Sequence, residues 1–249
     1  MDGRVVVITG AGSGIGRLAA LAFASRGACV VLVGRRESAL SDVAAAIAND
    51  RHCLVHAADL RKPVAATELI EAVVARFGRI DVLFNNAGTF DGSVPIDEVT
   101  PEQWQSSIDI NLSGAFFCAQ AAFRAMKRQM PQGGRIINNG SVSSQVPRPN
   151  AVAYSASKSA ITGLTRAISL EGRAFGITCG QIDIGNASTD MTSGMAKGMI
   201  QPDGTIRPEP TMSAANAVDA VLFMAGLPPE ANVPHLTVVA SAMPFGGRG

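Results

Sequence analysis

The sequence contains little charge and few aromatic side chains. Charged residues make up 16% of its 249 residues, and 21 basic and 20 acidic side chains leave a formal charge of +1. This near-neutrality excludes an extended basic surface for nucleic acid or for an anionic membrane, although a small local basic site is compatible with it. The chain has a single tyrosine, so chemistry that needs a phenol has only one candidate.

Long apolar runs and paired cysteines are also absent. There is no run of about 18 apolar residues, and the first apolar run, Val5–Ile8, is too short for the core of a signal peptide. We therefore predict no transmembrane helix and no membrane partner. The four cysteines are widely spaced and form no CxxC pair, which favours a reduced, cytoplasmic location. Hydrophobic residues nevertheless make up 47% of the chain, which predicts a deeply buried sheet, an oligomer interface, or both.

Short β-branched runs alternate with segments of helical period. Val5–Ile8 and Val30–Val33 are continuously apolar, as strands covered on both faces are. The alternation predicts a three-layer, doubly wound α/β fold, in which a predominantly parallel sheet of about seven strands carries helices on both faces. Further strands are expected at 53–57, 81–84, 135–138, 177–182 and 236–239.

The chain shows no internal repeat and no linker, so residues 1–249 are predicted to form a single domain. Residues 186–210 differ from the rest because they are rich in glycine, methionine and proline. We interpret this stretch as a mobile substrate flap with one short helix, since irregular segments of such length usually serve a function.

A glycine-rich segment, Thr9–Gly16, follows the first predicted strand and precedes a helical pattern. Glycine is required where a backbone turns sharply or approaches a phosphate without an intervening Cβ. The N-terminus of the following helix presents free N–H groups and a partial positive charge to a pyrophosphate. A plain tight turn would explain a lone glycine cluster, but the strand–turn–helix context favours a dinucleotide-binding site.

The end of the second predicted strand indicates which dinucleotide is bound. An acidic residue there usually holds the 2′-hydroxyl of NAD, whereas the 2′-phosphate of NADP requires a cation. This strand ends in Gly34-Arg35-Arg36, without a carboxylate. Arg35 is suited to a phosphate through its paired N–H donors, so we predict NADP in preference to NAD. The alternative is that both arginines are solvated in a helix-entry turn.

Tyr154 and Lys158 stand four residues apart, which on a helix places both side chains on one face. A phenol titrates near pKa ~10 and is a poor base at neutral pH, but a neighbouring ammonium stabilises the phenolate and lowers that pKa. An amphipathic helix could also carry such a pair by chance. The pair is evidence for a catalytic site only if other polar residues suited to the same chemistry accompany it.

Two further polar residues are candidates for the same site. Ser141 follows the predicted strand 135–138, where its hydroxyl could orient a substrate oxygen, although Ser143 and Ser144 compete for this role and ordinary turn chemistry would also explain them. Asn111 lies within a predicted helix despite its weak helix propensity. It either kinks the helix and binds a water on the path to Lys158, or is a locally capped or exposed asparagine.

Taken together, these motifs resemble those of the short-chain dehydrogenase/reductase family, closely over residues 4 to about 191. The resemblance is carried by Thr9-Gly-x-x-x-Gly-x-Gly16, Asn85-Asn86-Ala87-Gly88, Asn111, Ser141 and Tyr154-x-x-x-Lys158. It implies a Rossmann fold and a reversible hydride transfer between NADP(H) and a carbonyl or secondary alcohol. Tyr154 would be the general acid/base and Lys158 would lower its pKa and hold the nicotinamide ribose. Ser141 would steady the substrate oxygen and Asn111 would hold the relay water.

The resemblance also implies the remaining contacts and the assembly. Asp59 and Leu60 would meet the adenine, and Thr189 the carboxamide. The full set of implied cofactor contacts is Gly10, Ser13, Gly14, Ile15, Gly16, Arg35, Arg36, Asp59, Leu60, Asn86, Ala87, Gly88, Tyr154, Lys158 and Thr189. The family is commonly tetrameric through its two long central helices, so a homotetramer or homodimer is expected.

The chain departs from the family pattern after the sixth predicted strand. Ile184-Gly185 replaces Pro-Gly, and Gln181 and Asp183 are polar where members are often apolar. Arg148 could bind an acidic substrate group, but we interpret it as an exposed loop arginine. His52, His56 and His235 are scattered, so they are interpreted as core or edge residues and no metal is predicted.

Three other functions remain to be weighed. A 3-oxoacyl thioester reductase is a narrower interpretation, but members acting on carrier proteins tend to carry arginines near Gln132 and Phe175, and neither is present. A non-catalytic, NADP-binding regulatory protein is disfavoured because Tyr154 and Lys158 are both present. A nucleotide-sugar epimerase or dehydratase is disfavoured by the glycine spacing and by the lack of an added substrate domain.

Overall fold

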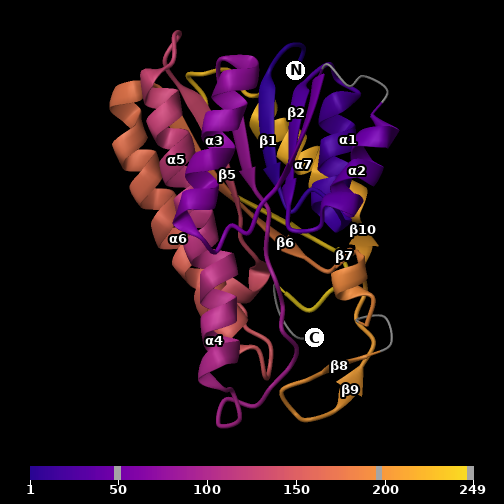
Figure 1. The fold of residues 1–249 in the computed structure, drawn as a ribbon. Coiled ribbons are helices and arrows are strands. Elements are labelled where there is room, and N and C mark those ends of the chain that lie inside the picture. The colour runs from indigo at the N-terminus through magenta and orange to yellow at the C-terminus, as the bar shows by residue number, and fades with distance from the viewer. Residues whose placement is uncertain (48–51, 195–197, 246–249) are drawn as a thin grey trace.

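The computed structural model describes residues 1–47, 52–194 and 198–245. Its centre is a seven-stranded sheet in the order β11-β6-β5-β4-β1-β2-β3, in which every neighbouring pair is parallel (Figure 1). This confirms the predicted doubly wound sheet. The strands are β1 (Val5–Thr9), β2 (Cys29–Gly34), β3 (Cys53–Ala57), β4 (Val82–Asn85), β5 (Gly134–Asn139), β6 (Ile177–Gly185) and β11 (His235–Val239).

The apolar run of β1 supplies both faces of the sheet. Val6 and Ile8 belong to one buried cluster, and Val5 and Val7 belong to the other. Alternate side chains of a strand point to opposite faces, so a strand covered on both sides must be apolar at every position. This is why β1 shows no alternation of polar and apolar residues.

Helices cover both faces and give the three layers that were predicted. One face packs against α1 (Gly14–Ala24), α2 (Glu37–Ala46) and α7 (Ala214–Gly226). The other packs against α3 (Pro63–Phe77), α5 (Ala115–Arg128) and α6 (Val152–Gly172). Figure 1 shows α3, α5 and α6 together on one side of the sheet, and α1 and α2 on the other. Among the helices that the structure describes, none is long and apolar enough to cross a bilayer.

The long helix expected from Pro101 onward is interrupted. It consists of α4 (Pro101–Ile108), a π-helical segment at Asp109–Gly114, and then α5. Thr100 caps α4 through a reciprocal pair of hydrogen bonds with Gln103, which fixes where the helix begins. The predicted irregularity around Asn111 is therefore confirmed, as a widened turn within a continuous helical path.

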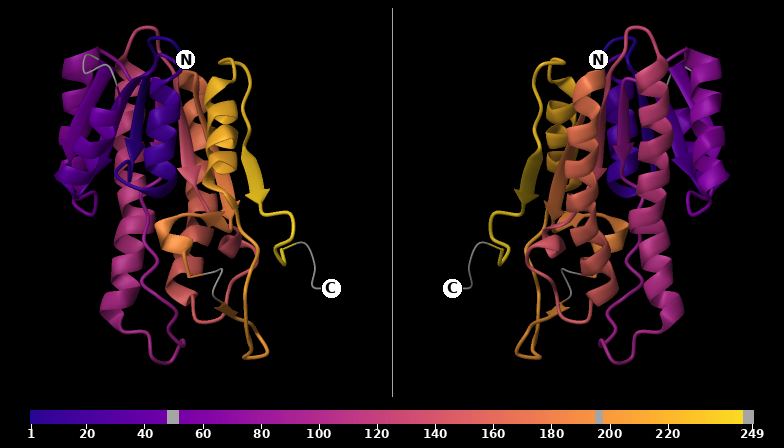
Figure 2. Two further views of the ribbon diagram at one scale, coloured as in Figure 1. Left: turned by 90° about the vertical axis from the view of Figure 1, so that its right-hand side faces the viewer. Right: turned by 90° about the vertical axis from the view of Figure 1, so that its left-hand side faces the viewer.

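Within the described residues, the flap holds one short helical element, as predicted. That region holds a single 3₁₀ turn at Asp190–Thr192 and three very short strands, β7 (Ala187–Ser188), β8 (Met199–Ile200) and β9 (Ile206–Arg207). Residues 195–197 of the predicted flap lie outside the described residues. β8 pairs with β9, and β7 pairs with β10 (Met212–Ser213). Figure 2 shows the arrow of β11 pointing to the end of the molecule where this segment lies.

Candidate functional site

The glycine-rich turn is fastened to the end of β4. Thr9 Oγ1 accepts hydrogen bonds from the backbone N–H groups of Asn86 and Ala87, both at 2.9 Å, and Asn86 Nδ2 donates to Thr9 O at 3.0 Å. Gly10 has a φ of +69°, and a Cβ at Gly16 would overlap the carbonyl oxygen of Gly10. These two positions therefore require glycine, because one needs a left-handed backbone and the other a close backbone approach.

The turn opens into a cleft at the carboxyl ends of the strands. One cavity of about 360 Å³ lies between the glycine-rich turn and the ends of β2, β3 and β4, and a second of about 170 Å³ continues from it toward α6. The two share lining residues, namely Gly10, Ser13, Ala87, Gly88 and Thr89. The N-terminus of α1 borders the second cavity, and the side chain of its N-cap residue Ser13 makes no capping bond, so the first N–H groups of the helix are left for a ligand.

This cleft fits a dinucleotide. All predicted cofactor residues except Gly16 line one or other cavity; they are Gly10, Ser13, Gly14, Ile15, Arg35, Arg36, Asp59, Leu60, Asn86, Ala87, Gly88, Tyr154, Lys158 and Thr189. Gly16 instead packs against the backbone of Gly10. An elongated hollow with glycine at its floor and a helix N-terminus at its middle accommodates two nucleotides joined by a pyrophosphate.

Arginines surround the end of the first cavity. Arg35 and Arg36 are exposed at the end of β2 and line it, as does Arg61. Asp59 forms an ion pair with Arg61 at 2.6 Å, and this hydrogen-bonded guanidinium, with a contribution from Arg35, lowers the pKa of the Asp59 carboxyl. The one carboxylate at this rim is thus held by a cation. Sequence reasoning missed Arg61, although its position two residues after Asp59 was a readable signal.

Tyr154 and Lys158 lie on one face of α6 and line the second cavity. Lys158 Nζ lies 5.8 Å from the centre of the Tyr154 ring and donates to Asn139 O at 2.8 Å. Burial lowers the pKa of Lys158 to about 8, against an opposing contribution from Asp183. An ammonium so poorly solvated retains a strong field at short range, because little water screens it.

The pKa of Tyr154 differs from the expectation. Burial raises it above its ordinary value, and the negative charge of Asp183 adds to this, whereas the hydrogen bond from Ser141 and the charge of Arg148 lower it. The expected lowering of this pKa is therefore not realised in the protein alone, because loss of water outweighs the nearby cations. A further positive charge in the second cavity would lower the pKa of Tyr154.

Ser141 caps the 3₁₀ turn η3 (Val142–Ser144), which follows β5. Its Oγ accepts a hydrogen bond from the backbone N–H of Ser143 at 3.1 Å and is hydrogen-bonded to Tyr154. Ser144 donates instead to the carbonyl oxygen of Ser141 at 2.7 Å. Of the three serines proposed, Ser141 is therefore the one whose hydroxyl meets the phenol.

Asn111 is buried within the π-helical segment. Its Nδ2 donates to Thr89 O at 3.0 Å and its Oδ1 accepts from Thr89 N at 2.8 Å, so it fastens the loop after β4 to the helix. A Cβ added at Gly88 would lie 3.1 Å from Asn111 Oδ1 and 3.6 Å from Lys158 Nζ. Asn111 and Lys158 therefore both lie close to Gly88. The alternative of an exposed asparagine is wrong.

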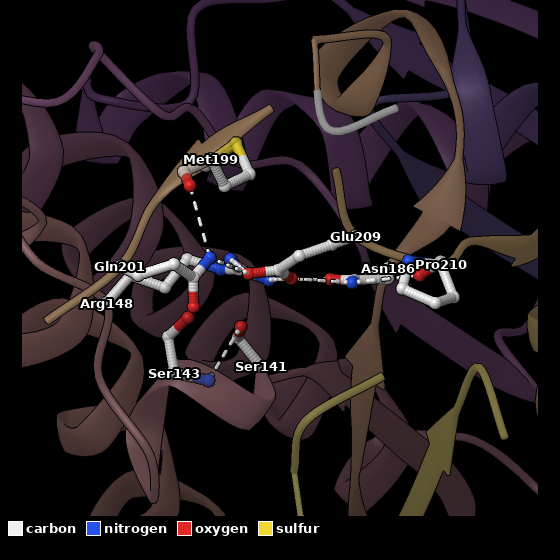
Figure 3. A network of polar contacts seen from close by, with 8 residues as sticks. All are labelled: Ser141, Ser143, Arg148, Asn186, Met199, Gln201, Glu209 and Pro210. Carbon is white, nitrogen blue, oxygen red and sulfur yellow. Dashed lines mark hydrogen bonds and ion pairs between the residues drawn. The ribbon is translucent and has the colours of Figure 1, made fainter. Parts of the chain in front are cut away.

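Arg148 is not the exposed loop arginine that was predicted. Its guanidinium binds the Glu209 carboxylate in parallel, with both N–O distances at 2.6 Å, and Nη2 also donates to Asn186 Oδ1 at 2.7 Å. Asn186 and Gln201 donate to the same carboxylate (Figure 3). These four donors lower the pKa of Glu209 to about 2 in spite of its burial. The sequence gives no signal for this pairing, because its members come from three separate loops.

The histidines have structural positions, as expected. His56 lies on β3 and His235 on β11, which are the two edge strands of the sheet. Within residues 1–47, 52–194 and 198–245, no group of three or more histidine, cysteine or acidic side chains could hold a metal ion. His235 instead contacts the buried carboxylate of Asp183 at 2.8 Å, a contact that sequence reasoning also missed.

Comparisons with known proteins agree with this architecture. The short chain dehydrogenase family model matches residues 4–199. A 3β-hydroxysteroid dehydrogenase of Mediterraneibacter gnavus is 36% identical over 77% of this chain and 68% of its own. A 3-oxoacyl-[acyl-carrier-protein] reductase of Synechocystis sp. is 35% identical over 78% of each chain.

A solved structure extends the likeness to nearly the whole chain. The 3-ketoacyl-(acyl-carrier-protein) reductase of Brucella melitensis, complexed with NADH, superposes with a TM-score of 0.86 at 27% identity, covering 97% of this chain and 98% of that one. The family model covers the glycine-rich turn, the end of β4, Asn111, Ser141 and the Tyr154–Lys158 pair. This chain belongs to the short-chain dehydrogenase family.

Proposed function

We propose that this protein is an NADP(H)-dependent oxidoreductase that transfers a hydride between the nicotinamide and a carbonyl or secondary alcohol. The observation that carries the proposal is that Tyr154, which is hydrogen-bonded to Ser141, and Lys158 both line the second cavity, at one end of a cleft suited to a dinucleotide. Membership of the family supports the same activity. The relative complexed with NADH supports a nicotinamide cofactor.

The cofactor would be held by backbone at its centre and by side chains at its ends. The glycine-rich turn and the N-terminus of α1 would hold the pyrophosphate, while Asp59 and Leu60 would border the adenine. At the other end, Lys158 would hold the nicotinamide ribose and Thr189 the carboxamide. When bound, the nicotinamide supplies the hydride chemistry, and the protein supplies orientation and charge.

The preference for NADP rests on local charge. Arg35, Arg36 and Arg61 all line the end of the cleft where a 2′-phosphate would lie, and Asp59 is engaged by Arg61. A guanidinium binds a phosphate through two parallel N–H donors. A free carboxylate at this rim would instead favour the 2′-hydroxyl of NAD.

In carbonyl reduction, the Tyr154 hydroxyl would donate its proton to the developing alkoxide. Ser141 would hold the substrate oxygen beside that hydroxyl, since its Oγ already bonds to the phenol. Lys158 would stabilise the phenolate that forms, through an ammonium poorly screened by water. Asn111 would hold the relay water while fastening the loop after β4 to the helix. In alcohol oxidation, the phenolate of Tyr154 would accept the proton.

The substrate is proposed to be uncharged near its reacting carbon. Phe90 meets the Tyr154 ring edge-on at 5.4 Å between ring centres, which gives the site an apolar wall. Arg148 is engaged by Glu209 and so is not offered to an acidic substrate group. A 3-oxoacyl thioester is a narrower candidate, supported by the two reductases of that class among the relatives. Gln132 and Phe175, where carrier-protein reductases tend to have arginines, still argue against a carrier protein.

A spectrophotometric screen tests the proposal directly. Ketones, aldehydes, short 3-oxoacyl thioesters and secondary alcohols are incubated with NADPH, NADH or their oxidised forms, and the absorbance of the reduced nicotinamide is followed. We expect turnover with at least one carbonyl and faster turnover with NADPH. Tight NADPH binding without turnover of any substrate would instead favour the non-catalytic, regulatory alternative.

We further propose that residues 1–249 act as one cytoplasmic domain with a flap at 186–210, and that the chain forms a homodimer or homotetramer. The central helices support an oligomer because Trp104, Phe116 and Leu170 expose 39%, 39% and 63% of their surfaces on α4, α5 and α6. Light scattering on the purified protein measures the assembly. A monomer at all concentrations would contradict the proposal. No nucleic acid or membrane partner is proposed.

A further inference from the structure

Asp183 is a fully buried carboxylate near the carboxyl end of β6. Its Oδ1 accepts from Gln181 Nε2 at 2.7 Å, and its Oδ2 lies 3.0 Å from Gln145 Nε2 and 3.3 Å from Ser144 Oγ. His235 Nε2, on the neighbouring edge strand, lies 2.8 Å from the same Oδ2. Burying a charge is costly unless it is paired and hydrogen-bonded, so this group is held by a cluster built around it.

The cluster supports the loop that carries Ser141. Ser144 bridges Asp183 and the carbonyl oxygen of Ser141. A Cβ at Gly140 would collide with Asp183 Oδ1, so the carboxylate lies directly against the backbone that leads into Ser141. Ser141 in turn is hydrogen-bonded to Tyr154. A continuous path of contacts therefore runs from Asp183 to the phenol.

The charge of Asp183 acts on Tyr154 and Lys158 in the same direction. It raises the pKa of Tyr154 and the pKa of Lys158, because a negative charge favours the protonated form of each. Arg148, in the loop after η3, acts on Tyr154 in the opposite direction, and its own charge is paired with Glu209.

The other elements around Asp183 contribute little charge. From β11 the only ionisable group at the carboxylate is His235, whose side chain is 44% exposed. The 3₁₀ turn η3 presents only neutral side chains, and Asp219, the one charged residue of α7, is exposed. Within the described residues, Asp183 is thus the buried carboxylate whose charge acts on both Tyr154 and Lys158, while the exposed Asp190 lines the second cavity beside them.

We propose that Asp183 is a positioning residue that fixes the Ser141 loop and keeps Tyr154 protonated, which favours carbonyl reduction over alcohol oxidation near neutral pH. The inference rests on the proposed function, because reduction uses the phenol of Tyr154 and oxidation its phenolate. A cation placed beside Asp183 would weaken this effect, because it would offset the charge that the carboxylate presents to Tyr154.

Tyr154 is the only tyrosine in the chain, so its ionisation can be followed without any substrate. We would titrate the cofactor-free protein and record the near-ultraviolet absorbance that a phenol gains on ionisation. In Asp183→Asn, which keeps the shape of the side chain, the midpoint is expected about 1 pH unit below that of the wild type. Asp219→Asn is the matched control and should leave the midpoint unchanged. Tyr154→Phe should abolish the signal and so verify its source.

A second variant covers the case in which Asp183→Asn does not fold. His235→Arg keeps the carboxylate but sets beside it, at a partly exposed edge position, a cation that stays charged throughout the titration. Its Tyr154 midpoint should move in the same direction by a smaller amount. Equal midpoints in wild type and in either folded variant would overturn the proposal, whatever the activity.

The kinetic readout separates positioning from a general structural effect. With a substrate found in the screen, the pH at which alcohol oxidation reaches half its maximal kcat should fall in Asp183→Asn by the same amount as the spectroscopic midpoint. A uniform loss of kcat at every pH, with no shift, would show that Asp183 only maintains the loop. A shifted phenol midpoint in a protein that turns over no carbonyl would uphold the electrostatic role and overturn the proposed function.

Discussion

The cofactor cleft and the region beyond Gly185 are built on different principles. In the cleft, backbone conformation dictates residue type, as at Gly10 and Gly16, where any other residue would be strained or would collide. Beyond Gly185, side chains from separate loops hold the chain in place, as Arg148 and Glu209 do. The first kind of site leaves a local motif in the sequence, and the second leaves none.

The largest expected effect comes from removing the proposed catalytic hydroxyl in the cleft. Tyr154→Phe removes the hydroxyl that would exchange the proton but keeps the ring that packs against Phe90. We expect kcat to fall about 10³-fold, within the range of general acid–base catalysis, while NADPH binding is unchanged. Steady-state kinetics and fluorescence titration measure the two quantities. Ser159→Ala, on the exposed side of α6, is the control, and wild-type turnover in Tyr154→Phe would remove the residue from its role.

The next prediction concerns the cost of burying Lys158. Its pKa of about 8 lies below the ordinary 10.5, so the folded protein binds fewer protons than the unfolded chain between these pH values. The free energy of unfolding of the cofactor-free wild type should therefore rise with pH across that window. Lys158→Met lacks this titration and should be more stable at pH 7 by up to about 3 kcal/mol, with the advantage lost by pH 10.5. Denaturant unfolding at several pH values measures it, and a constant difference would contradict it.

A third prediction tests whether side-chain contacts hold the flap in place. Glu209→Gln replaces a carboxylate that accepts from Arg148, Asn186 and Gln201, and should lower the free energy of unfolding by about 2 kcal/mol at pH 7. Because the folded pKa is depressed to about 2, the loss should be full above pH 4.5 and should vanish as the pH falls toward 2. Thermal unfolding across this range measures it.

Asp203→Asn is the matched control for that change. It removes the Asp203–Arg207 ion pair from the same flap, where the side chains are 54% and 66% exposed. An ion pair so exposed contributes little, and the control should leave the free energy of unfolding nearly unchanged. If both variants lost the same stability, burial of the Glu209 cluster would not be the reason.

The smallest effect concerns the rim of the cleft. Arg35→Asp should weaken NADPH relative to NADH by at least about tenfold, or about 1.4 kcal/mol, because a repulsive charge would replace a phosphate donor. Arg17→Asp makes the same change of charge at an exposed position outside both cavities. The dissociation constants of NADPH and NADH, measured for both variants, test this prediction. An equal NADPH-to-NADH ratio in wild type and Arg35→Asp would refute the phosphate assignment.

Much of the fold could be predicted from local sequence. Apolar runs such as Val30–Val33 identify buried parallel strands, because a strand covered on both faces needs an apolar residue at each position. The strand 177–182 was predicted too short because Asp183 interrupts its apolar pattern, yet β6 continues to Gly185. A buried polar residue is compatible with a strand when partners from neighbouring elements satisfy it, and those partners are distant in sequence.

Some residues of the candidate site could likewise be predicted from local sequence, and others could not. Residues tied to strand ends and helix spacing, such as Ser141 and Tyr154, could be named from their order along the chain. The surroundings of Arg148 could not, because its exposure depends on Glu209, 61 residues away. The helical element described in the flap, Asp190–Thr192, is only one 3₁₀ turn, since proline and glycine there favour turns and short ribbons over a longer helix.

The two ends of the flap are joined at its base. β7 pairs with β10 through Ala187 and Met212 (Figure 1), and Asn186 donates to the carbonyl oxygen of Pro210 (Figure 3). Because the two ends are joined, the length of the flap between them does not alter the central sheet. Doubling such a loop costs only about 0.6 kcal/mol of closure entropy. The flap can therefore differ in length and lining without a change in the sheet, and under the proposed function such a change would alter which substrates the site accepts.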